Sequence, residues 1–277
     1  ARMLTGAQLW LLTSAKNAFL FAGSGEFHWV GTSTKSLREA SDATFDVVIV
    51  DSLSPRVLWK KFLVAPTTKF CSVYGFVNGF DVHRLEFGHA RIAQIFGRQR
   101  KYAERPLLAL CAKQCPSKIK SEFIVIAVGG EWAFRTYQRW ADVVSCIREQ
   151  TQIPIVLLGS SNGLGAGEEL ASRNFTSCVN LVGTTTFHEA AYYIGESQLF
   201  LGADGGLWHV SCALNKPSVA LFAECDIFSP DGSRCLRVPL EKSDCRWFYA
   251  IDEVSSIDPR LIAEATLAML QECSAST

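Results

Sequence analysis

Short apolar runs alternate along the chain with longer segments in which apolar and polar residues mix. The clearest apolar runs cover residues 45–51, 123–128, 153–158, 199–201 and 218–222. Such runs, rich in Val, Ile and Leu, are typical of strands that are buried on both faces of a sheet. The mixed segments have helical composition, and Pro55 suits the first turn of one of them. This alternation predicts an α/β fold in which helices cover both faces of a parallel sheet.

Weaker patterns complete the expected order of elements. We expect further strands at residues 8–13, 27–30, 70–74 and 179–182. We expect helices at residues 16–22, 55–64, 81–97, 140–150, 166–172, 187–194, 207–214 and 259–270. Residues 159–165 are rich in Gly and Ser and predict a loop. The segment from residue 223 to about Ala250 has no clear period, so we expect it to be irregular.

The polar segment 112–122 separates two blocks of alternating elements. It contains Pro116 and several Lys residues, a composition that is typical of linkers. A chain of 277 residues is also long enough for two domains. We therefore expect an N-terminal domain over residues 1–116 and a C-terminal domain over residues 117–277.

The charges of the chain balance, with 27 Lys and Arg residues against 27 Asp and Glu residues. No overall field attracts nucleic acid or an anionic membrane, so an anion site has to be local. The apolar runs are far shorter than the roughly 20 residues that a membrane-spanning helix needs. No export signal is recognisable near residue 1, and we expect a cytoplasmic protein without a transmembrane segment.

Ten Cys residues are present, and most of them fall within expected strands and helices. Cys71, Cys146, Cys178 and Cys212 are interpreted as small core residues in a reducing compartment. Cys111 with Cys115, and Cys225 with Cys235 and Cys245, lie outside that description. A metal site usually shows closer pairs such as Cys-x-x-Cys, so free thiols are favoured over a metal centre.

A glycine turn joins a predicted strand to a predicted helix within residues 196–217. The turn reads Gly-Ala-Asp-Gly-Gly over residues 202–206. Glycine lets the backbone approach a ligand closely, and the N–H groups of a first helical turn attract anions such as phosphate. Asp204 and His209 then offer an acceptor and a titratable ring for a ribose or a pyrophosphate. The alternative is that Asp204 caps the helix and that His209 is a packed surface residue.

A second turn of this kind follows the strand at residues 123–128. Gly129 and Gly130 are followed by Arg135 and Arg139, and guanidinium groups suit phosphate oxygens. The alternative is that Arg139 is exposed and that Trp132, Tyr137 and Trp140 are core aromatic residues. Glu168 and Thr185 follow the next two strands. Each could contact a ligand, or each could only stabilise the N-terminus of a helix, Glu168 through the helix dipole and Thr185 as an N-cap.

These segments together resemble the glycosyltransferases of the ADP-heptose:lipopolysaccharide heptosyltransferase family. The resembling segments, in order, are residues 129–140, 156–159, 180–185, 202–209 and 216–222. The first resembles the family's Gly-Ala-Ser segment with its basic residue and Trp, and the third resembles its Asn-Leu-x-Gly-x-Thr turn. The fourth resembles the Asp-Ser/Thr-Gly-x-x-His signature, and the fifth resembles the Lys-Pro-x-Val-Ala-Leu-Phe ending.

The resemblance implies the GT-B architecture, in which two Rossmann-like domains face each other across a cleft. It implies a nucleotide-diphosphate sugar as donor, with an ADP-sugar favoured, and neither metal nor cofactor. The implied binding residues are Gly129, Gly130, Arg135, Glu168, Thr185, Asp204, Gly205, Gly206 and His209. The implied reaction is transfer of the sugar, with inversion, to a hydroxyl of a glycan, lipid-linked or protein acceptor. A place at the inner face of a membrane is compatible with this reaction.

The chain departs from the family pattern in two places. Gly205 stands where the family has Ser or Thr, which removes a hydroxyl donor for phosphate. Residues 2–10 resemble the end of the family's first helix, so the strand and Gly-x-x-Gly-Asp loop that carry the family's base are not in this sequence. They either precede it in the protein or have been lost. Asp51, at the end of a strand, is the candidate base in their place, unless it only caps the next helix. The alternative function is therefore an inactive glycosyltransferase-like subunit or scaffold of a larger assembly.

Overall fold

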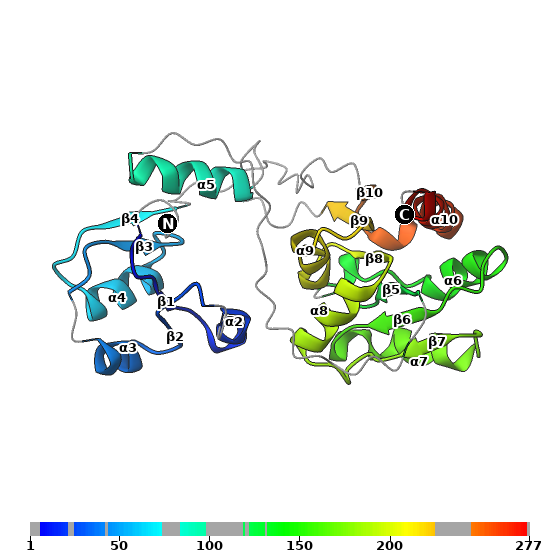
Figure 1. Cartoon of the computed structure of the whole chain (residues 1–277), viewed down its shortest axis with the longest axis horizontal. Helices are drawn as coiled ribbons and strands as arrows, with labels where there is room; N and C mark the ends of the chain where they lie inside the picture. The colour runs from blue at the N-terminus through cyan, green and yellow to red at the C-terminus, as the bar shows by residue number, and fades with distance from the viewer. Residues whose placement is uncertain are drawn as a thin grey trace. The chain divides into compact units, whose positions relative to one another are not determined.

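A computed structural model describes residues 6–21, 25–41, 44–73, 84–97, 119, 122–130, 132–224 and 245–275. The described residues up to 97 belong to one compact unit and those from 119 onward to a second (Figure 1). The predicted domain boundary at residues 116 and 117 lies outside the described residues. None of the described helices combines the length and the apolar character that are needed to cross a bilayer.

The second unit is built on a six-stranded parallel sheet. Its strands are β5 (Ile124–Ala127), β6 (Ile155–Leu158), β7 (Cys178–Asn180), β8 (Leu199–Ala203), β9 (Ser218–Glu224) and β10 (Cys245–Ile251). They lie in the order β10-β9-β8-β5-β6-β7, which is the doubly wound Rossmann order. The chain winds outward in opposite directions from β5 and β8, which are neighbours. The topological switch point, where such folds bind ligands, therefore lies between these two strands.

Helices cover both faces of this sheet (Figure 1). The helices are α6 (Trp140–Arg148), α7 (Leu164–Ser172), α8 (Phe187–Glu196), α9 (Gly206–Ala213) and α10 (Pro259–Ala275), with short 3-10 turns η1 (Ala133–Arg135), η2 (Ser161–Gly163) and η4 (Val254–Ser256). Ile124 and Ile126 of β5 pack with α6, α7 and α10, whereas Val125 and Ala127 pack with α8 and α9. Successive residues of a strand point to opposite faces, so a strand between two helix layers must be apolar throughout. The prediction of a parallel sheet covered on both faces is confirmed.

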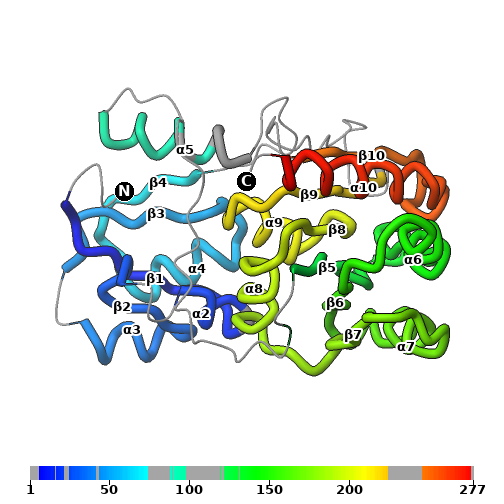
Figure 2. Tube along the Cα trace, turned by 45° about the vertical axis from the view of Figure 1, so that its right-hand side comes forward, coloured from blue at the N-terminus to red at the C-terminus, as the bar shows by residue number. Residues whose placement is uncertain are grey.

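The first unit contains two separate two-stranded parallel sheets, β1 with β2 and β3 with β4 (Figure 2). Its elements are β1 (Trp10–Leu12), α2 (Ala15–Phe21), β2 (Trp29–Gly31), α3 (Thr34–Ala40), β3 (Val48–Val50), α4 (Pro55–Val64), β4 (Phe70–Ser72) and α5 (Arg84–Ile95). The two pairs repeat the connectivity of β6 with β7 and of β8 with β9. In the second unit β5 joins those pairs into one sheet. Among the described residues of the first unit, no strand connects the two pairs in the way that β5 connects β6 and β8.

Two expectations about the elements are wrong. The segment before Ala250 is not irregular to its end, because β10 begins at Cys245 and pairs in parallel with β9 along its whole length. Its sequence, Cys-Arg-Trp-Phe-Tyr-Ala-Ile, is rich in the aromatic residues that favour strands, so the local signal was present and was missed. The helix α3 was not predicted, although Ser33 caps it by accepting a hydrogen bond from the Ser36 N–H at 3.0 Å.

Several element bounds also shift. Helix α7 begins at Leu164, inside the predicted loop 159–165, and α10 continues to Ala275. Cys146, Cys178 and Cys212 pack half-buried against the core, and Cys71 is half-buried in β4. The remaining Cys residues singled out above, apart from Cys245, lie outside the described residues.

Candidate functional site

The carboxyl ends of β5 and β8 lie side by side at the switch point of the second unit. Ala127, the last residue of β5, is in register with Gly202 of β8. The turn of residues 128–135 leaves β5, and the turn of residues 204–206 leaves β8. Both predicted glycine turns therefore meet at one edge of the sheet, where backbone and side chains of both can contact one ligand.

An ion pair joins the two turns. The Nη1 atom of Arg135 lies 3.5 Å from Oδ2 of Asp204, and their side chains are 19% and 5% exposed. The guanidinium group also lies over the ring of Phe134, 5.2 Å from its centroid. Removing a carboxylate from water is costly unless a cation compensates it, so Arg135 is the physical reason why Asp204 can be buried here.

His209 extends this pair to the surface. It lies in the first turn of α9, its Nε2 is 3.8 Å from Oδ1 of Asp204, and its side chain is 58% exposed. Its ring packs at a tilt against Trp208, with 4.9 Å between the centroids. Asp204 thus contacts a cationic group on one side and a titratable ring on the other. The N-cap of α9 is Gly205, so the alternative in which Asp204 occupies the cap is wrong.

The start of α9 is open. Gly205 has extended backbone, with φ of −178°, and it makes no side-chain cap. A Cβ atom at Gly206 would meet nothing within 4 Å. The first backbone N–H groups of this helix therefore lie beside free space, next to the Asp204 and His209 side chains. That arrangement suits an anionic group such as phosphate.

The turn after β5 is held by the turn after β6. Gly129 has φ of +92°, and a Cβ atom there would lie 2.7 Å from Cα of Gly163. The side-chain amide of Asn162 donates to the carbonyl of Gly130 at 2.6 Å. Ser160 Oγ in turn lies 2.6 Å from Oδ1 of Asn162. Sequence reasoning treated residues 159–165 only as a loop and missed Asn162; the Ser-Asn-Gly run was the signal for a turn with a structural amide.

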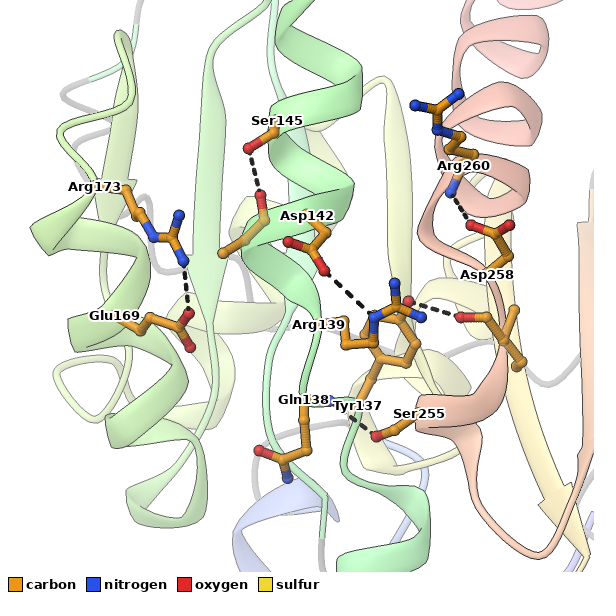
Figure 3. A network of polar contacts seen from close by, with 12 residues as sticks. Tyr137, Gln138, Arg139, Asp142, Ser145, Glu169, Arg173, Ser255, Asp258 and Arg260 are labelled. Atoms are coloured by element: carbon orange, nitrogen blue, oxygen red, sulfur yellow. Dashed lines mark hydrogen bonds and ion pairs between the residues drawn. The ribbon is translucent and has the colours of Figure 1, made fainter.

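A second set of contacts fixes the segment after Arg135 (Figure 3). The Tyr137 hydroxyl donates to the carbonyl of Ile257 at 2.9 Å, and the Gln138 N–H donates to Ser255 Oγ at 3.1 Å. Ser255 Oγ also lies 3.3 Å from the carbonyl of Thr136. The turn η4, after the edge strand β10, therefore holds the segment that carries Arg135. The segment that follows Arg135 is thus held by residues that do not belong to the Arg135–Asp204 pair.

Glu168 and Thr185 do not lie on the two turns that carry Arg135 and Asp204. Glu168 is exposed in α7, and Thr185 lies half-buried in the turn before α8. The N-cap of α8 is Thr186, whose hydroxyl and backbone form a capping box with Glu189. Both predicted residues follow strands that end at the same edge of the sheet as β5.

Asp51 belongs to the first unit. It follows β3, is exposed, and its Oδ1 accepts a hydrogen bond from the Ser52 N–H at 2.7 Å. The N-cap of α4 is Ser54, so Asp51 is not the cap of that helix.

A doubly wound parallel sheet, with two glycine turns, an ion pair and an open helix N-terminus at its switch point, defines a Rossmann-like protein of the kind that binds phosphate-bearing ligands. Residues 92–229 match the sequence profile of glycosyltransferase family 9 (heptosyltransferase). This match assigns residues 92–229, just under half of the chain, to that family.

Individual relatives agree with this assignment. The chain is 29% identical over 185 residues to lipopolysaccharide heptosyltransferase 2 of Escherichia coli K12. The aligned region covers 61% of this chain and 49% of that protein. The chain thus spans about half the length of the curated relatives that it matches.

Solved structures show the same fold. The structure of E. coli ADP-heptose lipopolysaccharide heptosyltransferase II matches with a TM-score of 0.71 and 19% identity, over 98% of this chain and 93% of that one. E. coli heptosyltransferase WaaC with ADP matches with a TM-score of 0.67 and 13% identity, over 100% of this chain and 92% of that one. The GT-B fold that the sequence resemblance implied is confirmed.

Proposed function

We propose that this protein transfers a sugar from a nucleotide-diphosphate sugar to an acceptor hydroxyl, with inversion and without a metal ion. The observation that supports the proposal is the Arg135–Asp204–His209 group, which sits beside the open start of α9 at the switch point. A diphosphate placed on the first turn of α9 would be within reach of the Arg135 guanidinium. The Asp204 and His209 side chains could then bind the ribose hydroxyls or a second phosphate oxygen.

An ADP-sugar is the proposed donor. One of the two structural relatives is an ADP-heptose heptosyltransferase and the other is a heptosyltransferase in complex with ADP. The signature around Asp204 resembles that of the same family. We assign Gly129, Gly130, Gly205 and Gly206 to close backbone approach. Glu168 and Thr185 are assigned to the periphery of the same binding site, because the strands before them end at this edge of the sheet.

In the proposed reaction, the acceptor hydroxyl oxygen attacks the anomeric carbon from the side opposite the diphosphate. The new C–O bond forms as the bond from the anomeric carbon to the diphosphate oxygen breaks, and a carboxylate takes the hydroxyl proton. The negative charge that develops on the leaving diphosphate is stabilised by Arg135 and by the N-terminus of α9, in the role that a metal ion plays elsewhere. Asp51 is the proposed base, because it is an exposed carboxylate at the carboxyl end of a strand in the first unit.

We further propose a glycan, lipid-linked or protein acceptor and a cytoplasmic location, including the inner face of a membrane. Cys71, Cys146 and Cys178 are free thiols, which suits a reducing compartment.

A second candidate is a subunit that binds nucleotide without transferring sugar. The observation that favours it is Gly205, which places no hydroxyl at the cap of α9 where the family has Ser or Thr. Such a protein would keep the fold and the Asp204 group but would not release the nucleotide by transfer.

Calorimetry with ADP, GDP and UDP, followed by an ADP-release assay with ADP-sugars and lipid-linked acceptors, tests both candidates. We expect ADP to bind and Asp204→Ala to weaken its binding about 10- to 100-fold, through loss of a hydrogen bond to a charged group. Asp142→Ala is the matched control, because its carboxylate is 54% exposed and pairs only at the surface with Arg139. Binding that survives Asp204→Ala contradicts the assigned site, whereas binding without acceptor-dependent ADP release favours the second candidate.

A further inference from the structure

The outward face of α4 carries large aromatic side chains. Trp59 is 68% exposed and Phe62 is 50% exposed, three residues apart on one face of the helix. Surface helices normally present polar residues to water and apolar ones to the core. In α4, Val57 and Val64 are half-buried, so the helix already has an inward apolar side, and its exposed aromatics are additional to it. Exposed aromatic area of this kind marks an interaction surface.

The aromatic area continues onto β4. The ring of Phe70, a residue 39% exposed, meets that of Phe62 edge to face, with 6.1 Å between the centroids. The Lys61 ammonium lies 4.5 Å from the Phe62 centroid and 5.0 Å from the Phe70 centroid. It also donates a hydrogen bond to the carbonyl of Pro66 at 3.2 Å. Lys61 is buried, so a fixed positive charge lies beneath the two rings and holds them in place.

The charged residues of α4, of β4 and of the turn between them are all basic. Residues 52–73 contain Arg56, Lys60, Lys61 and Lys69, and they contain no Asp or Glu. Arg56 and Lys69 are exposed at the two ends of the aromatic area. We call the group of Arg56, Trp59, Lys60, Phe62, Lys69 and Phe70 the α4 patch. It is strongly basic although the net charge of the whole chain is zero.

We propose that the α4 patch docks on the surface of a lipid bilayer that contains anionic lipids. Trp and Phe side chains insert at the level of the headgroups, and neighbouring Lys and Arg side chains are attracted to anionic headgroups. A second copy of the chain is a poor occupant of a two-fold interface, because basic residues would face the same basic residues with no carboxylate on the patch. The inference uses only the first unit and does not depend on the proposed sugar transfer.

Vesicle co-sedimentation of the full chain tests this docking. We expect binding to vesicles of phosphatidylcholine with phosphatidylglycerol, and much weaker binding to phosphatidylcholine alone. Trp59→Ala with Phe62→Ala should lower the partition coefficient about tenfold or more, because two interfacial aromatics are lost. Lys60→Gln with Lys69→Gln should lower it severalfold and reduce its dependence on salt.

Matched controls come from the second unit. Trp247→Ala removes a Trp that is 47% exposed in β10, and Arg173→Gln removes an exposed cation of α7. Both should bind vesicles like the wild type, and circular dichroism melting should show that all variants are folded. Equal binding of the Trp59/Phe62 variant and the wild type would overturn the proposal. So would sedimentation velocity showing that the patch holds a dimer, or vesicle binding that ignores lipid charge.

Discussion

The guanidinium of Arg135 and the carboxylate of Asp204 lie 3.5 Å apart, although one follows β5 and the other follows β8. The contact exists because β5 and β8 are neighbours in the sheet while their connections wind in opposite directions. The pair therefore marks the switch point directly. It also keeps a nearly buried carboxylate paired, at the place where we propose that a diphosphate binds.

This pair should contribute measurably to stability. Arg135→Met and Asp204→Asn should each lower the free energy of unfolding by about 1–3 kcal/mol, because each removes an ion pair between two side chains that are largely shielded from water. The double variant should lose less than the sum, with a coupling energy of about 1–2 kcal/mol in a urea-denaturation cycle. The pair of Arg139 and Asp142 is the control. Its atoms lie 3.3 Å apart, but both side chains are about half exposed, so its coupling should stay below about 0.5 kcal/mol. Equal coupling in the two cycles would contradict a shielded site.

Much of this architecture could be predicted because it rests on local patterns. The run of residues 123–128 is apolar throughout since β5 is covered on both faces, and the prediction needed no tertiary information. The glycine turns at Gly129 and Gly205 were recognisable because turn residues punctuate a sequence. The positions of Asp204 and Arg135 at the ends of their strands followed from those turns.

Other features depend on contacts that no local pattern encodes. That β5 and β8 are adjacent follows from the order of strands in the sheet. The contact between Arg135 and Asp204 could therefore not be predicted from either turn alone. Asn162 acts through a hydrogen bond to Gly130 across two different turns. Roles of the site residues in binding stay predictions.

Gly129 should tolerate no side chain. Its φ of +92° is unfavourable for other residues, and an added Cβ atom would lie 2.7 Å from Cα of Gly163, which is backbone and has little freedom to move. We expect Gly129→Ala to lower the free energy of unfolding by about 2–4 kcal/mol. Gly165→Ala is the matched control, because it lies in α7 with nothing within 4 Å of the new Cβ atom. That variant should be stabilised by about 0.5–1 kcal/mol. A Gly129→Ala protein as stable as the wild type would show that the two turns are not in close contact.

Tyr137 should make the protein less stable in alkali. Burial raises the pKa of its hydroxyl well above the ordinary value of 10.0, although Arg139 acts in the opposite direction. The folded state therefore keeps the proton where the unfolded state loses it, so the stabilisation is complete below about pH 10 and declines above it by up to about 1.4 kcal/mol per pH unit. Burial lowers the pKa of Lys216, which gives a contribution of opposite sign.

Comparing the wild type with Tyr137→Phe isolates the Tyr137 contribution, because Lys216 is common to both. At about pH 8 the variant should be less stable by about 1 kcal/mol, for the lost hydrogen bond to Ile257. That difference should shrink as urea denaturation is repeated at rising pH above about 10. Parallel curves for the two proteins would mean that the hydroxyl is not shielded in the folded state.

Gly205 offers a way to test what the missing hydroxyl does at the start of α9. Its backbone is extended, with φ of −178°, and an added Cβ atom would come no nearer than 3.8 Å to the carbonyl oxygen of Ala203. Gly205→Ser should therefore fold normally and gain a few tenths of a kcal/mol, as expected when Ser replaces Gly at an N-cap. If a phosphate binds at this turn, the new hydroxyl should also tighten ADP binding about 3- to 10-fold in calorimetry. Gly205→Ala adds the same Cβ atom without the hydroxyl and should bind ADP like the wild type. Equal affinities of the Ser and Ala variants would mean that the hydroxyl of the family pattern does not reach the nucleotide in this protein, and the diphosphate would have to be placed elsewhere along the switch point.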